Sequence, residues 1–146
     1  MGKIGNTDLA KFMDQININT ATCYNCCRAA VSKIRENGKG GGRIVNVVAR
    51  PALEPRQGAG MIAYTASKAA IAALTQALAA ELSGEQILVN AVAPSAIDTP
   101  ANRKAMPNAD FSKWVKPKEI ARQMMFLATR ENTATSGGII PIFGKI

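Results

Sequence analysis

Residues 43–48 read Arg43-Ile44-Val45-Asn46-Val47-Val48, and residues 87–92 read Ile87-Leu88-Val89-Asn90-Ala91-Val92. Each run is short, rich in β-branched residues and almost continuously apolar, which is typical of a parallel strand buried on both faces. Between the two runs, alanine takes seven of the twelve positions 69–80, within a stretch from Tyr64 to Leu82 that predicts a helix. A strand, a helix and a second strand in this order predict a right-handed β-α-β unit.

The flanking sequence extends this unit on both sides. Asn6-Thr7-Asp8 offers caps for a first helix through residues 9–31 that ends near the glycines of residues 38–42. After the second strand, residues 94–114 form a long irregular segment of the kind that often makes a substrate lid. A third helix begins at Pro117, and residues 139–143 are a last strand that Pro141 confines to a sheet edge. We therefore expect an α/β fold of three layers, with a parallel sheet of about three strands between helices, in a single domain over residues 1–146.

Composition excludes several classes of protein. Hydrophobic residues make up 47% of the 146 residues and charged residues 19%, which is ordinary globular usage and argues against a disordered chain. The most apolar stretch covers only the twelve residues 69–80, so we expect no membrane span, and no apolar signal-peptide core follows Met1. We therefore expect a cytoplasmic protein. The net charge of +8 favours anionic ligands, but the basic residues are dispersed and not interleaved with aromatic residues, so we expect no specific nucleic-acid partner.

Acid–base chemistry in this chain cannot use histidine, because the sequence contains none. The sharpest alternative is Tyr64-Thr65-Ala66-Ser67-Lys68, in which Tyr64 and Lys68 stand four residues apart and therefore share one face of a helix. A phenol with a pKa of about 10 is a poor catalyst at neutral pH, and about 4 kcal/mol of preferential phenolate stabilisation is needed to lower that pKa to about 7. A desolvated Lys68 would supply much of it, so the sequence predicts a lowered pKa for Tyr64.

The three cysteines invite a metal or redox interpretation. Cys23, Cys26 and Cys27 form a Cys-x-x-Cys-Cys run inside the expected first helix. Structural zinc takes four ligands, and neither a histidine nor a fourth cysteine is present. Cys23 and Cys27 share the apolar face of the helix, where free cysteine behaves as a small hydrophobic residue. We therefore expect no metal site.

Several motifs resemble those of the short-chain dehydrogenase/reductase family, and they occur in the family's order over about 130 residues. The first strand with its extension, residues 44–49, is similar to the family's Ile-Val-Asn-Ile-Ser-Ser strand. Tyr64 and Lys68 match its Tyr-x-x-x-Lys motif. Residues 89–94 are similar to its Val-Asn-x-Val-x-Pro-Gly motif, with Ser95 where glycine is usual. Residues 18–20 and 97–99 resemble two further segments of the family, one on each side of this core.

The resemblance implies a function and a set of site residues. It implies an NAD- or NADP-dependent oxidoreductase acting on a small carbonyl or alcohol substrate. In the implied catalytic set, Tyr64 is the general acid or base, Lys68 lowers its pKa, and Asn19 holds a water of the proton relay. The implied contacts to the nicotinamide side of the cofactor are those of Tyr64, Lys68, Pro94, Ile97 and Thr99.

The sequence also departs from the family pattern. The resemblance covers only the C-terminal half of a family member, so we expect a truncated Rossmann-like sheet whose front half is absent. The only glycine cluster, residues 38–42, follows a helix, whereas a phosphate cradle opens one. The family's substrate-orienting serine falls at Val48 or Ala49, which have no hydroxyl. We therefore expect the isolated chain to bind no cofactor tightly and to turn over little or no substrate.

Two functional interpretations remain open. The chain is either the catalytic half of an oxidoreductase or an inactive truncated relic that acts as a self-associating module. Under either interpretation we expect a homo-oligomer, a dimer or a tetramer. The first strand, residues 44–48, would have no partner on one side and carries no lysine, proline or bulge that protects an edge. The alanine-rich helix and the first helix offer a second surface for association.

Overall fold

The computed structural model describes residues 2–38 and 40–145. It contains three strands, β1 (Gly42–Val47), β2 (Ile87–Pro94) and β3 (Ile139–Ile142). The α-helices are α1 (Leu9–Gln15), α2 (Thr22–Asn37), α3 (Arg50–Leu53), α4 (Ile62–Glu81), α5 (Pro100–Ala105) and α6 (Pro117–Ala128). A π-helical segment, Ile16–Ala21, joins α1 to α2, and short 3-10 turns lie at Ile4–Asn6, Pro55–Gly58, Ser83–Glu85 and Phe111–Lys113.

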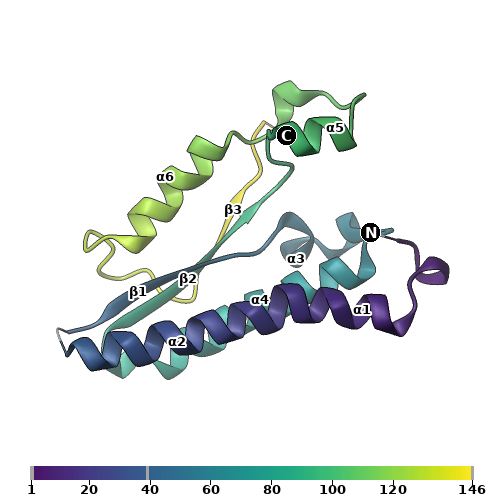
Figure 1. Cartoon of the computed structure of the whole chain (residues 1–146). Coiled ribbons are helices and arrows are strands. Elements are labelled where there is room, and N and C mark those ends of the chain that lie inside the picture. Colours follow the sequence, from purple (N-terminus) through teal and green to yellow (C-terminus); the bar gives the residue numbers. More distant parts are fainter. Residues whose placement is uncertain (1, 39, 146) are drawn as a thin grey trace.

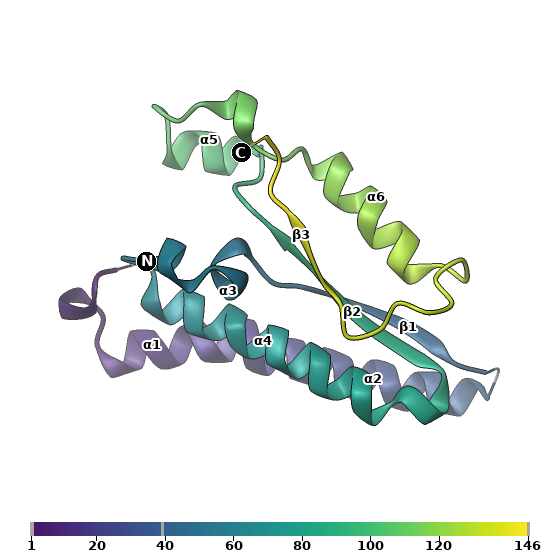
Figure 2. The same cartoon turned by 180° about the vertical axis from the view of Figure 1, so that it is seen from behind.

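The sheet is parallel and its strands lie in the order β1-β2-β3. The register runs from Gly42 opposite Ile87 to Val47 opposite Val92, and β3 begins with Ile139 opposite Ala91. Helices α1, α2 and α4 lie on one face of the sheet and α6 on the other (Figures 1 and 2). This confirms the predicted three-layer α/β fold with a three-stranded parallel sheet.

The core lies between the sheet and the pair α2 and α4. Leu82, Ile87 and Val89 are almost fully buried there, together with Cys27 and Ala79. The alanines of α4 allow its backbone to approach β2 and α2 closely, because they carry no bulk beyond a methyl group. On the opposite face α6 covers the sheet with a smaller set of buried residues, namely Val92, Val115, Ile120 and Leu127.

One polar network is buried within this apolar core. The Nδ2 of Asn46 on β1 donates to Thr75 Oγ1 at 2.9 Å, and Thr75 Oγ1 donates to the carbonyl of Ile71 at 2.8 Å. The thiol of Cys27 lies 3.4 Å from Asn46 Oδ1, which it can donate to. The network joins β1, α2 and α4, and it satisfies side chains that would otherwise be costly to bury.

The first helix differs from the continuous α-helix that the sequence predicts. Helical backbone does run from Leu9 to Asn37, but residues 16–21 are π-helical. This segment is bonded to α4: Asn19 Nδ2 donates to Ser67 Oγ at 3.2 Å, and Thr20 Oγ1 donates to the carbonyl of Ser67 at 3.0 Å. A π-helical turn is uncommon and is often found at a functional site.

The other predicted elements are observed with small changes. Helix α4 begins at Ile62, so Tyr64 and Lys68 lie in its first two turns. Residues 94–114 are less irregular than expected, because they contain α5 and a 3-10 turn. Pro141 lies on the edge strand β3 and is exposed, as predicted.

Candidate active site

A cleft of about 540 Å³ opens at the carboxyl ends of β1 and β2. Its walls come from α3 and the start of α4 on one side and from α5 and the 3-10 turn Phe111–Lys113 on the other. The volume is typical of a pocket for a small ligand. The carboxyl ends of parallel strands are also where ligands bind in open α/β sheets.

Tyr64 and Lys68 both line this cleft, as the spacing of the two residues predicts. The ammonium of Lys68 lies 5.9 Å from the centroid of the Tyr64 ring, at the limit of a cation–π contact. Its hydrogen bond, however, goes elsewhere: Lys68 Nζ donates to the carbonyl oxygen of Val47 at 3.1 Å. The pair is therefore brought together, but the ammonium is held on the backbone of β1.

The titration behaviour of this pair differs from the expectation. Burial raises the pKa of Tyr64 above its ordinary value, because the phenolate loses solvation. Burial likewise lowers the pKa of Lys68, and the nearby Cys23 opposes that change. The predicted lowering of the Tyr64 pKa by Lys68 is thus not observed, because desolvation dominates and Lys68 bonds to Val47.

Asn19 lies behind the cleft, outside its lining. Its side-chain amide donates to Ser67 Oγ at 3.2 Å and to Gln15 Oε1 at 3.4 Å. Ser67 Oγ in turn donates to the carbonyl of Tyr64 at 2.8 Å. Asn19 is therefore linked to the backbone of Tyr64 through one hydroxyl, rather than to the phenol itself.

The other expected contact residues separate into two groups. Pro94 and Ile97 line the cleft beside the end of β2, where Ile97 forms a bridge with Val115. Thr99 is outside the lining, and its Oγ1 accepts from the backbone N–H of Asn102 at 3.2 Å as the cap of α5. Four of the five predicted contact residues are thus grouped in one cleft.

The two positions where the family's substrate-orienting serine would fall also lie in the cleft. Val48 and Ala49 are buried in its lining. Ser67 and Thr65 are outside the lining and do not replace the missing hydroxyl, and Ser95 lines the cleft but its Oγ donates to the carbonyl of Phe143 at 2.9 Å. Thr65 Oγ1 is buried without a hydrogen-bond partner among the described residues.

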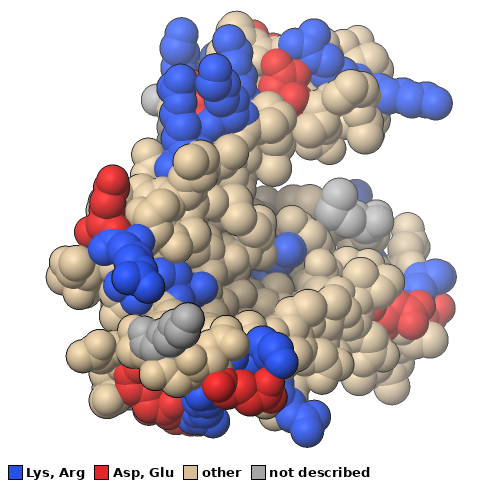
Figure 3. Space-filling model, turned by 60° about the vertical axis from the view of Figure 1, so that its left-hand side comes forward, with Lys and Arg blue, Asp and Glu red and all other residues tan. Residues whose placement is uncertain are grey.

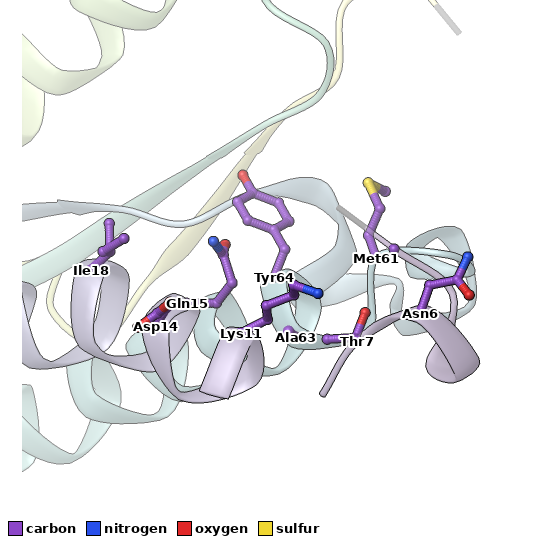
Figure 4. A pocket seen from close by; sticks show the side chains of 10 residues that line it. Asn6, Thr7, Lys11, Asp14, Gln15, Ile18, Met61, Ala63 and Tyr64 are labelled. Atoms are coloured by element: carbon purple, nitrogen blue, oxygen red, sulfur yellow. The ribbon is translucent and has the colours of Figure 1, made fainter. Parts of the chain in front are cut away.

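A second cavity, of about 420 Å³, adjoins Tyr64 on the side of α1. In Figure 4 the ring of Tyr64 rises from α4 between the side chains of Gln15 and Met61, and its hydroxyl points away from α1. Lys11 and Asp14 also line this cavity. Tyr64 and Met61 line both cavities, so this tyrosine can be approached from two directions.

Several lining residues were missed by the sequence reasoning. Arg50, Gln57, Trp114 and Phe143 all face the cleft. Arg50 follows the first strand directly, and its place at the carboxyl end of a parallel strand was the available signal. Trp114 ends the segment 94–114 that was expected to form a substrate lid, which was the signal available for it, whereas Phe143 reaches the cleft through the path of the chain after β3, which no local pattern reveals.

The charge of the surface is uneven. Lys and Arg side chains gather on the upper part of the molecule, at the height of α5 and α6, and a hollow lies below them (Figure 3). Within residues 2–38 and 40–145, no helix combines the length and the apolar character needed to cross a bilayer. In the same part of the chain, no three His, Cys, Asp or Glu side chains lie together as a set of metal ligands would.

The cysteines occupy three different environments. Cys27 is buried, Cys23 is partly buried and Cys26 is exposed, and all three are free thiols. Cys23 and Cys27 lie against the hydrophobic core of the sheet, as the helical spacing predicts.

Comparison with known proteins identifies relatives of the whole described fold. The sequence profile of a family described as Enoyl-(Acyl carrier protein) reductase matches residues 1–144. The chain is 33% identical over 139 residues to the 3-oxoacyl-acyl-carrier-protein reductase of Thermotoga maritima, covering 90% of this chain and 55% of that protein. The fold superposes on acetoin dehydrogenase from Enterobacter cloacae with a TM-score of 0.85 at 31% identity, covering 97% of this chain and 57% of that one.

A further similar structure was solved with a nicotinamide cofactor. ElxO with bound NADP has a TM-score of 0.84 and 26% identity, over 97% of this chain and 60% of that one. The chain spans about half the length of the curated relatives it matches, such as the 55% for the Thermotoga protein. Because that profile matches nearly every residue, and because a short-chain type dehydrogenase/reductase from Picea abies is 33% identical over 140 residues, the chain belongs to the short-chain dehydrogenase/reductase family.

Proposed function

We propose that this chain carries the catalytic part of an NAD- or NADP-dependent oxidoreductase acting on a small carbonyl or alcohol substrate. One observation carries the proposal: Tyr64 and Lys68 line a cleft of about 540 Å³ at the carboxyl ends of two parallel strands. A cleft of that kind is the usual ligand site of this architecture. The family membership supports the same chemistry.

The residues of the cleft fit the nicotinamide end of the cofactor. Lys68 offers an ammonium that the core does not neutralise, and Pro94 and Ile97 offer an apolar wall beside it. The glycine-rich segment fits the phosphate end poorly, because Gly40 and Gly41 lie between α2 and β1 rather than before a helix. The described residues would therefore hold only the nicotinamide half.

Tyr64 supplies the proton in this proposal. Because burial raises its pKa, the phenol is protonated at neutral pH and can donate to the oxygen of a carbonyl substrate. A bound reduced nicotinamide supplies the hydride that the reduction also requires. The protonated state favours reduction at neutral pH, whereas oxidation needs a phenolate that this environment disfavours.

Lys68 and Asn19 act as supports for Tyr64. The ammonium of Lys68, held on the carbonyl of Val47, places a positive charge over one face of the cleft. Asn19 and Ser67 link the π-helical segment to the backbone of Tyr64 and so restrict its position. We assign them the roles of charge placement and positioning.

A second candidate, an inactive self-associating module, is favoured by a specific observation. Val48 and Ala49 provide no donor where the family orients its substrate, and losing such a donor typically costs about 2.7–4 kcal/mol of transition-state stabilisation. We therefore expect the isolated chain to show little or no turnover. The two candidates differ in whether the cleft binds a nicotinamide at all.

Assembly is part of both candidates, and we propose a homo-oligomer. No described strand pairs with the outer edge of β1, and a groove of about 590 Å³ lies between α2 and α4. An unpaired edge favours pairing with another strand. Light scattering should find a dimer or tetramer at micromolar concentration. A monomer whose β1 amide hydrogens exchange rapidly would contradict association through the edge of β1 and through the groove between α2 and α4.

Calorimetric titration with NADH and with NADPH tests the cofactor assignment. We expect binding no tighter than about millimolar, because only contacts to the nicotinamide half are present. Lys68→Met should weaken it further. Micromolar affinity would contradict this expectation and imply that a second chain completes the site.

The catalytic role is tested by a matched pair of variants, Tyr64→Phe and Tyr24→Phe. Each change removes one hydroxyl, but Tyr24 is exposed on α2 and lies outside the cleft. Any NAD(P)H-dependent reduction of a small ketone by the chain should be abolished in Tyr64→Phe and unchanged in Tyr24→Phe. Activity that survives in Tyr64→Phe would contradict the assignment.

A further inference from the structure

The charged residues that line the cleft are all of one sign. They are Arg50, Lys68 and Lys113, and no aspartate or glutamate belongs to the lining. Charges of one sign with low-dielectric walls raise the local concentration of a ligand of the opposite sign. Lys68 is held on the backbone of Val47 beside Tyr64, so the cations available to the far part of a substrate are Arg50 and Lys113.

Arg50 is fixed in place in a way that suits ligand recognition. Its Nε donates to Glu54 Oε2 at 2.7 Å, and its guanidinium stacks on the ring of Phe143 with 4.8 Å between Cζ and the ring centroid. Only 25% of its side chain is exposed. These two contacts fix the plane of the guanidinium, so less side-chain conformational entropy of Arg50 is lost when a ligand binds.

The remaining donors of Arg50 have no partner. Within residues 2–38 and 40–145, the hydrogen bond to Glu54 uses only Nε, and neither Nη1 nor Nη2 is hydrogen-bonded. A guanidinium presents its terminal N–H groups in a plane that matches the two oxygens of a carboxylate or phosphate. Arg50 is thus ion-paired with Glu54 through Nε alone, and among the described residues its terminal N–H groups have no acceptor.

Apart from the polar residues Gln57, Ser95 and Asn102, the rest of the cleft lining is apolar or aromatic. Its large apolar and aromatic side chains include those of Met61, Met106, Trp114 and Phe143. A purely hydrophilic anion would make no apolar contact with these side chains. The lining therefore matches a ligand with an apolar body and one charged end.

We propose that the substrate of this site is a small carbonyl or alcohol compound that carries an anionic group, a carboxylate or a phosphate, and that Arg50 binds this group. The inference rests on the proposed oxidoreductase function and adds the substrate class and a specificity-determining residue. Glu54 competes with the ligand for the guanidinium, because its carboxylate already occupies Nε.

Binding can be measured without turnover, because Trp114 is the single tryptophan and lines the cleft. Its fluorescence reports titration of the full chain with 3-phenylpropanoate, 3-phenylpropanamide or 2-phenylethyl phosphate. The acid and the amide differ only in charge and terminal group. We expect the acid to bind at least about tenfold more tightly than the amide, and the phosphate shows which anion is preferred.

Three variants assign that preference. Arg50→Gln should weaken binding of the acid about tenfold and change the affinity for the amide by less than about twofold. Arg56→Gln is the matched control, since Arg56 is exposed and outside the lining, and it should change neither ligand. Glu54→Gln should strengthen binding of the acid, because the glutamine amide oxygen can still accept from Arg50 Nε and hold the guanidinium, while the competing negative charge is removed. If the Arg50–Glu54 pair had only a structural role, Arg50→Gln and Glu54→Gln would both weaken binding of the acid.

The outcomes separate this inference from the proposed function. Equal binding of acid and amide, or equal weakening of both by Arg50→Gln, overturns the anion receptor. If Arg50→Gln unfolds, weaker binding of the acid in Glu54→Gln overturns it instead. A chain that discriminates the acid through Arg50 but shows no nicotinamide binding would retain the receptor and lose the oxidoreductase assignment.

Discussion

The two halves of helix α4 serve different purposes. Its first two turns place Tyr64 and Lys68, both partly exposed, on a cleft where burial disfavours their charged forms. Its later turns bury Ile71, Thr75 and Ala79 against the sheet and α2. One helix thus carries a polar site with disfavoured charges at one end and a hydrogen-bonded, apolar core at the other, so changes in the two halves should affect different properties.

The largest effect on stability is expected from Ile71→Ala in the core half. Ile71 is 2% exposed and packs with Val48 and Ala91. Removing its buried methyl and methylene groups should cost about 2–5 kcal/mol of unfolding free energy, measured by urea denaturation. A cost below about 1 kcal/mol would show that the core half of α4 is not tightly packed.

A smaller loss is expected from Thr75→Val, which changes shape little but leaves Asn46 Nδ2 without its acceptor. The buried amide should cost about 1–3 kcal/mol of unfolding free energy. The control is Thr22→Val, because Thr22 is exposed and its hydroxyl donates to the carbonyl of Asn17 on the helix surface. Equal effects in the two variants would mean that the buried network contributes nothing specific.

In the site half, Lys68→Met should slightly raise the melting temperature at neutral pH. Burial lowers the pKa of Lys68 in the folded state, so the folded chain binds fewer protons there than the unfolded chain. The free energy of unfolding of the native chain, relative to that of the variant, should therefore increase as pH rises from below the lowered pKa of Lys68 to above 10.5, its ordinary value. A difference that does not change with pH would contradict the desolvation of Lys68.

The smallest change is spectroscopic. Tyr24→Phe leaves Tyr64 as the single tyrosine of a chain that has two. Its ultraviolet titration should give a midpoint above 10.0, the ordinary value, because burial raises the pKa. A midpoint below 10.0 would mean that Lys68 lowers this pKa after all, as the sequence predicts.

The difference between the halves of α4 also explains what the sequence could predict. The strands and the core face of α4 follow from local apolar patterns, and Tyr64 and Lys68 follow from their spacing in one helix. The direction of the Tyr64 pKa does not, because it depends on where the Lys68 ammonium bonds. That acceptor, the carbonyl of Val47, belongs to a strand whose position relative to α4 only the folded chain defines.

Other parts of the site depend on contacts between distant segments. Thr99 was expected in the cleft, but its hydroxyl caps α5, a helix that the sequence pattern did not predict. Asn19 reaches α4 through a π-helical segment that no helical periodicity indicates. Arg50 is held in part by stacking on Phe143, which is far away in the sequence.

The central claim is that the site half of α4 binds the nicotinamide end of a cofactor, and an NMR titration with NADH tests it most directly. Amide signals of Lys68, Ser95 and Ile97, which line the cleft, should shift together with about millimolar affinity, and Lys68→Met should reduce those shifts. Signals in the groove between α2 and α4, such as those of Val31 and Leu78, should remain unchanged. No shift in the cleft, or shifts confined to that groove, would contradict the claim.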